Sequence, residues 1–332
     1  GGVSKVVMRG TKSIMQSSNA LYVIDGVPIF SGRSTKSGGT EFDSRGSSEP
    51  IADINPEDIE SMSVLTGAAA AALYGSEAAN GAIVITTKKG KEGRVSITVN
   101  SNTEFTTPFV MPRFQTRYGT GMEGVQNISG ARSWGRKLTE ANYYGYSPQD
   151  DYFQTGVIAT ESVSFSTGTE KNQTYASAAA VNSKGIVPNN KYNRYNFTVR
   201  NTTSFLDDKM TLDFGASYIL QNDRNMTNQG TYNNPLVGAY LFPRGNDWED
   251  ISMYERYDPA RKIYTQYWPV GDEAMTMQNP YWVNYRNLRE NKKDRYMLNA
   301  NLSYQILDWL SVSGRVRLDN SNNDYTEKFY AS

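Results

Sequence analysis

The stretch INPEDIESMSVLTGAAAAALYGSEAANGAIVITTKKG, residues 54–90, sets the organisation of the N-terminal part of the chain. Its first residues are typical of a helix start. Asn55 can cap the helix, and Pro56 suits the first turn, where its missing N–H is not needed. Residues 61–65 then alternate polar and apolar side chains and predict a short strand.

The second half of this stretch predicts a helix, a tight turn and another strand. Residues 68–74 are mostly alanine, the best helix former, and Gly75 stands where a left-handed cap would end the helix. Asn80-Gly81 is the strongest two-residue turn signal in the chain, and the β-branched residues 82–87 predict a strand. The stretch therefore encodes a compact α+β unit.

Three blocks of sequence match one family in order and spacing: YVIDGVP at 22–28, NPEDIESMSVL at 55–65 and YGSEAANGAIVITTKKGK at 74–91. Together they resemble the plug domain of TonB-dependent outer-membrane transporters, and more narrowly the SusC/RagA branch found in Bacteroidetes. The chain departs from the branch pattern at Thr66, Gly67 and Glu77, where Lys, Asp and Arg are more common. The plug signature is carried by Asp25, Gly26, Tyr74, Gly75, Asn80 and Gly81.

The composition excludes several classes of function. The chain has 332 residues, with 34 Lys and Arg against 34 Asp and Glu, and neither Cys nor His. A balanced charge lacks the basic footprint of a nucleic-acid-binding protein. The absence of His and Cys excludes His-based triads, thiol nucleophiles and ordinary zinc sites. Since no run approaches the ~18 apolar residues of a membrane helix, the chain either stays in water or crosses a membrane as strands.

After residue 93 the sequence alternates apolar and polar side chains with a period of two. About seven strands are predicted, including a weaker one at 174–181, and the longer runs approach the ~9–11 residues of a tilted transmembrane strand. A soluble β-sandwich also alternates, but it rarely carries connections as long as those predicted here. The clearest apolar runs are Val95/Ile97/Val99, Tyr195/Phe197/Val199, Leu212/Phe214/Tyr218, Leu298/Leu302/Tyr304 and Leu310/Val312/Val316.

The predicted connections alternate in length. Tight turns are expected at 169–172, 206–209 and 307–309, and long loops at 107–158 and 222–294. Short turns at one end and long loops at the other are typical of outer-membrane barrels. Parity then places the long loops outside the cell and the short turns in the periplasm.

The expected fold class is an α+β plug domain, residues 1–92, followed by part of a transmembrane antiparallel β-barrel, residues 93–332. Seven strands are too few to close a plugged barrel of ~22 strands, so an open edge is expected. The first and last residues favour an internal fragment of a longer precursor. A further strand is predicted over 3–8, and a loop over 31–50. Contacts between plug and barrel are expected to be mainly polar.

The resemblance implies TonB-dependent import of oligosaccharides or peptides across the outer membrane, in a multi-pass barrel surrounded by lipid. The implied partners are a SusD-like lipoprotein lid and TonB, which would act through a segment outside this sequence. No enzymatic activity and no cofactor are expected. One alternative is an iron-chelate or cobalamin receptor of the same architecture. Another is a surface glycan-binding β-protein without transport, which would not behave as a membrane-embedded barrel on fractionation.

Candidate ligand-binding residues lie in the long aromatic loop. Trp248, Tyr267, Trp268 and Trp282 could stack on sugar rings, although such residues can equally form the loop's own small core. Charged residues on the polar faces of strands can pair with plug residues or line a wet lumen: Arg200, Asp213, Arg315 and Arg317. The segment 319–327 resembles a loose calcium loop but lacks the Gly and Glu of an EF-hand, so no metal site is expected.

Overall fold

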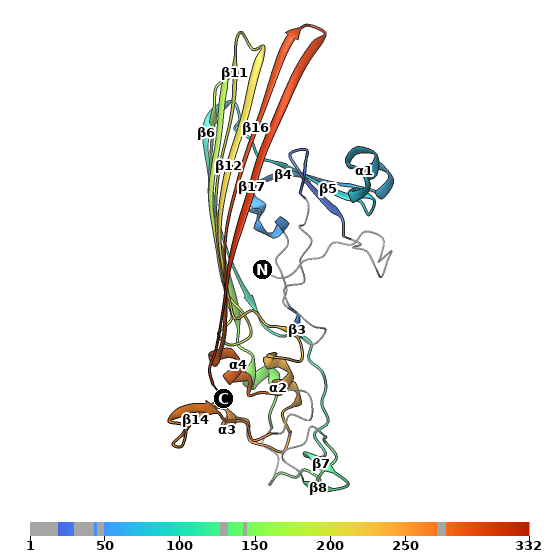
Figure 1. Cartoon of the computed structure of the whole chain (residues 1–332), viewed down its shortest axis with the longest axis vertical. Helices are drawn as coiled ribbons and strands as arrows, with labels where there is room; N and C mark the ends of the chain where they lie inside the picture. Colours follow the sequence, from blue (N-terminus) through green and yellow to red (C-terminus); the bar gives the residue numbers. More distant parts are fainter. Residues whose placement is uncertain are drawn as a thin grey trace.

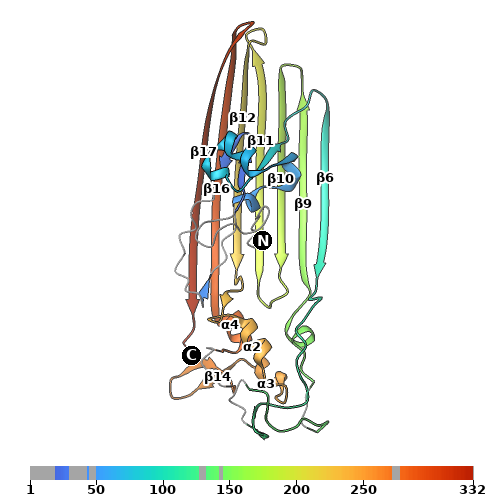
Figure 2. The same cartoon turned by 90° about the vertical axis from the view of Figure 1, so that its right-hand side faces the viewer.

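A computed structural model of the chain describes residues 19–29, 43–44, 50–126, 132–141, 145–270 and 277–331. The strand predicted over 3–8 and most of the predicted loop at 31–50 lie outside these ranges. A long sheet forms the wall of the molecule, a small α+β domain lies beside one of its faces, and a group of short helices lies at one end (Figures 1 and 2).

The small domain, called the plug here, contains a four-stranded sheet in the order β2-β1-β5-β4. β1 and β5 run parallel and the other pairs run antiparallel. The chain alternates around this sheet with short helices, as the α+β prediction required. The elements are β1 Leu21–Ile24, β2 Val27–Ile29, η1 Pro50–Asp53, η2 Pro56–Asp58, β4 Ile59–Leu65, α1 Gly67–Tyr74, η3 Ser76–Ala78 and β5 Ala82–Thr87.

Apolar side chains on both faces of this sheet form the plug's two small cores. One contains Ile24, Ile83 and Ile85, and the other contains Val23 with Ala70 of α1. Because successive strand residues point to opposite faces, β1 contributes to both. Both cores lie inside the plug, so the domain carries its own hydrophobic stabilisation.

Two local predictions within the plug need correction. The helix expected from Pro56 is a single 3-10 turn, capped by the Asn55 side chain accepting from the Glu57 N–H at 3.2 Å, and β4 starts directly after it. Gly75 has a positive φ of 79°, but its ψ of −166° is extended rather than left-handed helical, because the chain turns straight into η3. Gly81 has the positive φ, 102°, that the predicted turn requires.

The wall is a seven-stranded antiparallel sheet in the order β17-β16-β12-β11-β10-β9-β6. Its strand number agrees with the prediction, and β6 and β17 are its two edges, so the barrel is not closed. The predicted tight turns follow β9, β11 and β16. The strands are β6 Gly93–Thr106, β9 Gly156–Gly168, β10 Asn172–Lys184, β11 Lys191–Phe205, β12 Met210–Arg224, β16 Asn287–Leu307 and β17 Leu310–Phe329.

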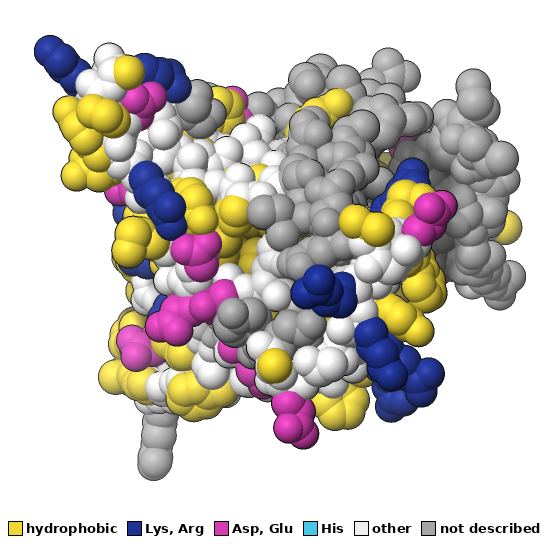
Figure 3. Space-filling model, turned by 90° about the horizontal axis from the view of Figure 1, so that it is seen from below, with side chains coloured by type: hydrophobic (Ala, Val, Ile, Leu, Met, Phe, Trp, Pro, Cys, Tyr) yellow, Lys and Arg dark blue, Asp and Glu magenta, His cyan; other side chains and the backbone are white. Residues whose placement is uncertain are grey.

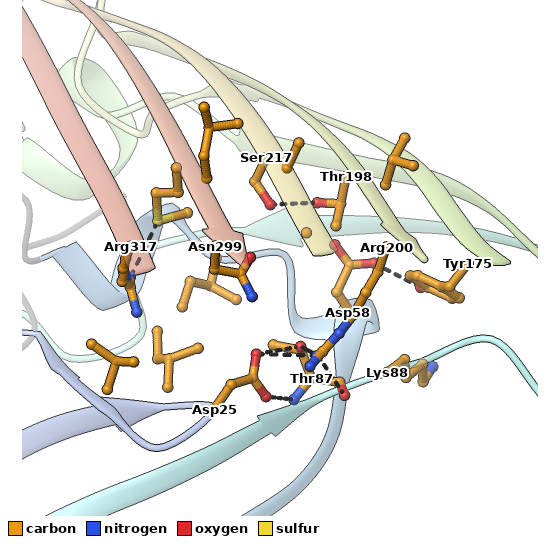
Figure 4. A pocket seen from close by; sticks show the side chains of 18 of the residues that line it. Asp25, Asp58, Thr87, Lys88, Tyr175, Thr198, Arg200, Ser217, Asn299 and Arg317 are labelled. Carbon is orange, nitrogen blue, oxygen red and sulfur yellow. Dashed lines mark hydrogen bonds and ion pairs between the residues drawn. The ribbon is translucent and has the colours of Figure 1, made fainter. Parts of the chain in front are cut away.

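The two faces of the wall differ in polarity. Arg200 is 6% exposed and faces the plug (Figure 4). Its neighbour Val199 is 47% exposed and lies on the other face, because successive strand residues point to opposite faces. Val316 on β17 is 72% exposed on the outer face. Apolar side chains exposed on that same face include Val163, Phe197, Phe214, Leu298 and Leu302.

Several wall strands are longer than the alternation predicts. β12 continues to Arg224 and β16 begins at Asn287, so both ends of the predicted loop 222–294 are strand. The segment 319–327, which loosely resembles a calcium loop, is also strand: it pairs in register with residues 289–297 of β16. Beyond the apolar region both faces of these strands are polar. The backbone hydrogen bonds between the strands continue there, but the sequence no longer alternates between apolar and polar residues, so it does not predict a strand.

The two long connections pack together at one end of the wall and form what we call the loop module. Its interior is aromatic: Tyr146 stacks on Trp248 at a ring separation of 4.2 Å, and Phe242 and Tyr152 meet the same indole edge-on. Seen from this end, charged side chains of both signs lie among hydrophobic ones (Figure 3). The remaining elements are β7 Gly121–Met122, β8 Val125–Gln126, η4 Pro148–Tyr152, α2 Pro235–Leu241, α3 Trp248–Ser252, β14 Glu255–Asp258, β15 Ile263–Gln266 and α4 Pro280–Arg286.

One short pairing connects the plug region with the loop module. β3, Asp43–Ser44, pairs antiparallel with β13, Gln229–Gly230. Within the described ranges, no helix has the length and apolar character needed to span a membrane.

Candidate functional site: the interface between plug and wall

A cavity of about 390 Å³ lies between the plug and the polar face of the wall. Strands of both parts line it, and charged and hydroxyl side chains converge on it (Figure 4). The plug side includes Asp25, Asp58 and Thr87, and the wall side includes Arg200 and Arg317.

The turn between β1 and β2 brings the signature residue Asp25 to the wall. Its carboxylate accepts from the Thr87 N–H at 2.9 Å and from the Thr87 hydroxyl at 2.7 Å, which fixes the turn on the end of β5. The same carboxylate pairs with Arg200 of β11 at 3.2 Å. Arg315 of β17 donates to the Asp25 carbonyl at 3.1 Å.

Gly26 permits this close approach. Its φ is 78°, and a Cβ at this position would lie 2.7 Å from Nη1 of Arg315. A side chain would therefore be strained by the backbone and would also displace the arginine. The glycine of the signature is therefore explained first by its positive φ, and its contact with Arg315 adds to this.

Arg200 joins the plug turn to a second acid on the wall. Its Nε and Nη2 donate to the two carboxylate oxygens of Asp213 at 3.0 and 2.9 Å. Asp213 also pairs with Lys89, just beyond β5, at 2.9 Å. Of the two alternatives for the lumen-facing charges, pairing with the plug is therefore present for Arg200 and Asp213, and it links the end of the plug sheet where β1 and β5 finish to β11 and β12.

A second ionic cluster centres on Asp53, at the end of η1. Asp53 is 0% exposed, and its Oδ2 accepts from Lys293 and, at 2.8 Å, from Arg295, both on β16. Arg295 also forms a bidentate pair with Asp319 of β17, at 2.9 and 2.8 Å. A fully buried carboxylate is tolerated only with such compensation, so the two cations stabilise this docked position.

Hydrogen bonds outside these ion pairs complete the interface. The Tyr175 hydroxyl of β10 donates to Asp58 at 2.8 Å, and Asn196 of β11 donates to the Asp53 carbonyl at 2.6 Å. Arg194 donates to the Ala52 carbonyl. These contacts from the wall are polar, as predicted.

This arrangement suits an attachment that can be released. Paired buried charges hold a defined geometry but contribute little net stability, because their desolvation offsets their attraction. Separation along these contacts would expose hydrogen-bonding groups that water can satisfy. Across the described ranges, no group of three or more acidic side chains is arranged to hold a metal ion.

The other signature residues support the plug itself. Tyr74 packs against the core formed by Val23 and Ala70, Gly75 ends α1, and Gly81 forms the turn before β5 with Asn80 preceding it. The signature thus combines two residues at the interface with four that shape the domain.

The aromatic candidates lie in the loop module. Trp248 and Trp282 are buried, the latter to 1% exposure, so they belong to the loop's own core rather than to a surface. Burial also raises the pKa of the Tyr146 and Tyr152 phenols above their ordinary value. Trp268 is half-buried against this core, and Tyr267 is half-buried at its edge, stacked under Arg256 at 3.3 Å. A hydrogen bond from the Tyr267 hydroxyl to Asp250, 2.6 Å, raises the pKa of Tyr267.

Several interface residues were not singled out from the sequence, among them Asp53, Tyr175, Lys293 and Arg295. Lys293 and Arg295 fall within or beside the region predicted as a loop, and Asp53 precedes the matched block 55–65. The sequence could have predicted the position of Lys293 and Arg295. They are two residues apart, so they lie on one face of a strand, and they continue the polar face of β16.

Comparison with known proteins agrees with this architecture. Residues 1–82 match the model of the TonB-dependent Receptor Plug Domain family. The chain is 27% identical over 293 residues to TonB-dependent receptor SusC of Bacteroides thetaiotaomicron, covering 85% of this chain and 26% of that protein. It is 31% identical over 236 residues to TonB-dependent receptor P39 of Formosa agariphila, covering 70% of this chain and 20% of that protein.

The fold is also that of a solved transporter. The structure of the RagAB peptide importer in its open-open state matches with a TM-score of 0.61 at 19% identity, covering 96% of this chain and 36% of that chain. The chain spans about a quarter of the length of the curated relatives it matches. With its plug, its polar interface and its open seven-stranded wall, the chain is a part of a TonB-dependent receptor of the SusC/RagA family.

Proposed function

We propose that the whole protein imports oligosaccharides or peptides across the outer membrane in a TonB-dependent manner. Residues 1–92 would be its plug unit and residues 93–332 the first strands of its barrel. The likeness to SusC and the fold shared with a peptide importer support the substrate range.

The observation that carries this proposal is that the two faces of the wall differ: one is polar and binds the plug, and the other is apolar and exposed. The inner face binds the plug through ionic and hydrogen-bonded contacts, and the outer face exposes apolar side chains such as Phe197, Val199 and Val316. Exposed apolar area on this scale is costly in water and favourable in lipid.

Aromatic residues mark both borders of this apolar face. Tyr296 and Tyr304 are exposed on β16, and Trp309 is exposed in the short turn that follows. The two tyrosines are eight residues apart (304 − 296), about 27 Å along the strand. A strand tilt of about 40° reduces this to a height of about 21 Å, close to the ~25 Å apolar band of outer-membrane barrels.

The interface then becomes the element that transport must open. TonB would act on the plug from the short-turn end, and a SusD-like lipoprotein would cover the loop module at the other end. Movement of the plug would break the pairs of Asp25 and Asp53 with the wall and open a path along its polar face. The energy would come from the inner membrane, not from chemistry in this chain.

We assign substrate contact within the loop module to Tyr267 and Trp268, which are partly exposed, with Trp248 and Trp282 supporting them from inside. Tyr267→Ala should reduce uptake while leaving the module folded. Trp248→Ala should unfold the module, because loss of a buried Trp costs about 3–5 kcal/mol. Equal uptake by wild type and Tyr267→Ala would remove Tyr267 from the site.

Growth on defined nutrients tests the function. Cells lacking the gene should fail to grow on one glycan or peptide of a panel, and the full-length gene should restore growth only when TonB is intact. Restoration with iron chelates or cobalamin instead would support the alternative receptor class. Binding of a glycan without TonB-dependent uptake would support a surface binding protein.

A further inference from the structure

Three cations lie in one row across neighbouring strands at the long-loop end of the wall. Lys184 of β10 is directly opposite Lys191 of β11, which is directly opposite Arg224 of β12. All three side chains are exposed. We call these three residues the cationic row; β10, β11 and β12 lie side by side in Figure 2.

This row lies on the outer face. Side chains two residues apart in a strand share a face, so Lys191 lies on the same side as Tyr195, Phe197 and Val199. Those three residues are exposed on the face away from the plug. The cationic row is therefore outside the lumen, where an imported substrate does not pass.

The row is electrostatically unfavourable on its own. Like charges directly opposite each other in a sheet are destabilising. Arg224 is compensated by Glu290 of β16 at 3.1 Å. Throughout the described part of the chain, neither Lys184 nor Lys191 has an acidic partner within ion-pair distance. An anion bound between the two lysines would relieve the repulsion.

The position of the cationic row along the membrane normal indicates which molecule supplies that anion. Lys191 is four residues beyond Tyr195 (195 − 191), about 13 Å along the strand and about 10 Å in height at a tilt of about 40°. Tyr195 lies at the border of the apolar face, with its hydroxyl donating to Asn182 at 3.2 Å. The lysines therefore reach the level of the polar headgroups, which begin where the hydrocarbon core ends.

The opposite end of the wall has the reverse charge. Its short turns carry more acidic than basic residues: Glu170, Lys171, Asp207, Asp208, Lys209 and Asp308. An asymmetric membrane with phosphate groups in its outer leaflet would favour cations at that border and not at the other.

We propose that the cationic row binds a phosphorylated lipid headgroup of the outer leaflet, with the phosphate between Lys184 and Lys191. This inference rests on the proposed membrane location of the wall. The ligand is a lipid phosphate, and the bound headgroup joins β10 and β11, the two strands that carry these lysines.

Thermal unfolding of the full-length protein in lipid nanodiscs tests the proposal. The discs contain phosphatidylcholine alone, phosphatidylcholine with phosphorylated lipid A, or phosphatidylcholine with dephosphorylated lipid A. Phosphorylated lipid A should raise the Tm of the wild type. The double variant Lys184→Gln/Lys191→Gln should lose about half of that rise or more. Lys184→Arg/Lys191→Arg should retain the rise, and so should the control Lys209→Gln at the short-turn end.

Four results would overturn the proposal: an equal rise in the double Gln variant, an equal rise with dephosphorylated lipid A, an equal rise with inorganic phosphate in phosphatidylcholine discs, or a change in the number of protein copies per disc between wild type and variant. The last would assign the row to a second copy of the protein. Heat-modifiable mobility of the wild type is measured first. Its absence would contradict the proposed membrane function, whereas its presence without a lipid effect would contradict this inference alone.

Discussion

Asp53 shows how a single buried carboxylate can position a domain. It lies in a one-turn helix of the plug, is fully buried, and meets Lys293 and Arg295 of a strand about 240 residues later in the chain. Both cations are themselves buried, and Arg295 also pairs with Asp319. The contact therefore specifies where the plug lies on the wall more than it adds to overall stability.

Removal of this acid should loosen the plug. In Asp53→Ala, Lys293 and Arg295 lose a buried counter-charge, and breaking a buried pair from one side costs about 3 kcal/mol or more. Hydrogen exchange of the backbone amides in 51–58, apart from Pro56, measures the opening free energy in the full-length protein. The matched control is Glu60→Ala, because Glu60 is exposed and lies 3.8 Å from Lys91; its effect should stay below about 1 kcal/mol. Equal protection in the two variants would contradict the account.

The glycine of the Asn80-Gly81 turn should be sensitive for a different reason. Gly81 has φ 102°, so Gly81→Val forces a β-branched residue into a conformation that costs about 1 kcal/mol or more. Gly75→Val should behave similarly at φ 79°. Glu77→Arg, on an exposed side chain between them, should change the unfolding free energy by about 0.5 kcal/mol or less. Growth on the cognate nutrient and yield of folded protein provide the comparison, and equal values for all three variants would be inconsistent with these turns.

At the level of elements, the sequence predicts a strand well wherever one of its faces is apolar. The runs ending in Val199, Tyr218 and Val316 alternate clearly, and the structure has strands at all three. Prediction fails where both faces are polar: residues 287–294 and 319–327 carry the same ladder with no apolar face to reveal it. Lys293 was missed for that reason, although it is central to the interface.

The sequence also does not predict buried contacts between elements that are far apart in the chain. The signature predicted that Asp25 and Gly26 matter, but only the three-dimensional structure places Arg200 and Arg315 beside them. The aromatic loop shows the same limit, since its composition is equally compatible with a surface for sugars and with a buried core. Trp248 and Trp282 are in the core.

If the outer face of the wall contacts lipid, a charged residue placed on it should make the free energy of folding into a membrane less favourable. Val316 lies near the middle of the apolar face, so Val316→Lys in the full-length protein should cost about 2–4 kcal/mol when the barrel folds into lipid vesicles. Ser313→Lys is the matched control on the opposite face of the same strand, and should cost little. Urea titration of folding into vesicles measures both. A cost at Ser313 greater than that at Val316 would reverse the two faces.

For the whole molecule, the plug lies against the polar face of the wall, and the loop module lies at one end of the wall (Figures 1 and 2). The chain enters the wall at β6 from the plug, at the end that carries the three short turns, and the loop module lies at the opposite end (Figures 1 and 2). Because the short turns and the loop module lie at opposite ends, the orientation of the wall in the membrane determines which of them faces the periplasm. If the short turns are periplasmic, TonB and the plug lie on the same side and the loop module faces incoming substrate.

Cysteine accessibility on intact cells tests this central claim most directly, because the chain has no cysteine of its own. Ala260→Cys lies in the exposed tip of the β14–β15 hairpin of the loop module, and Asp207→Cys and Asp308→Cys lie in exposed short turns. In the full-length protein, an impermeant thiol reagent should label the cysteine at position 260 and leave those at 207 and 308 unlabelled until the outer membrane is permeabilised. Labelling at 207 and 308 but not at 260 would contradict the orientation and, with it, the assignment of the loop module to substrate capture.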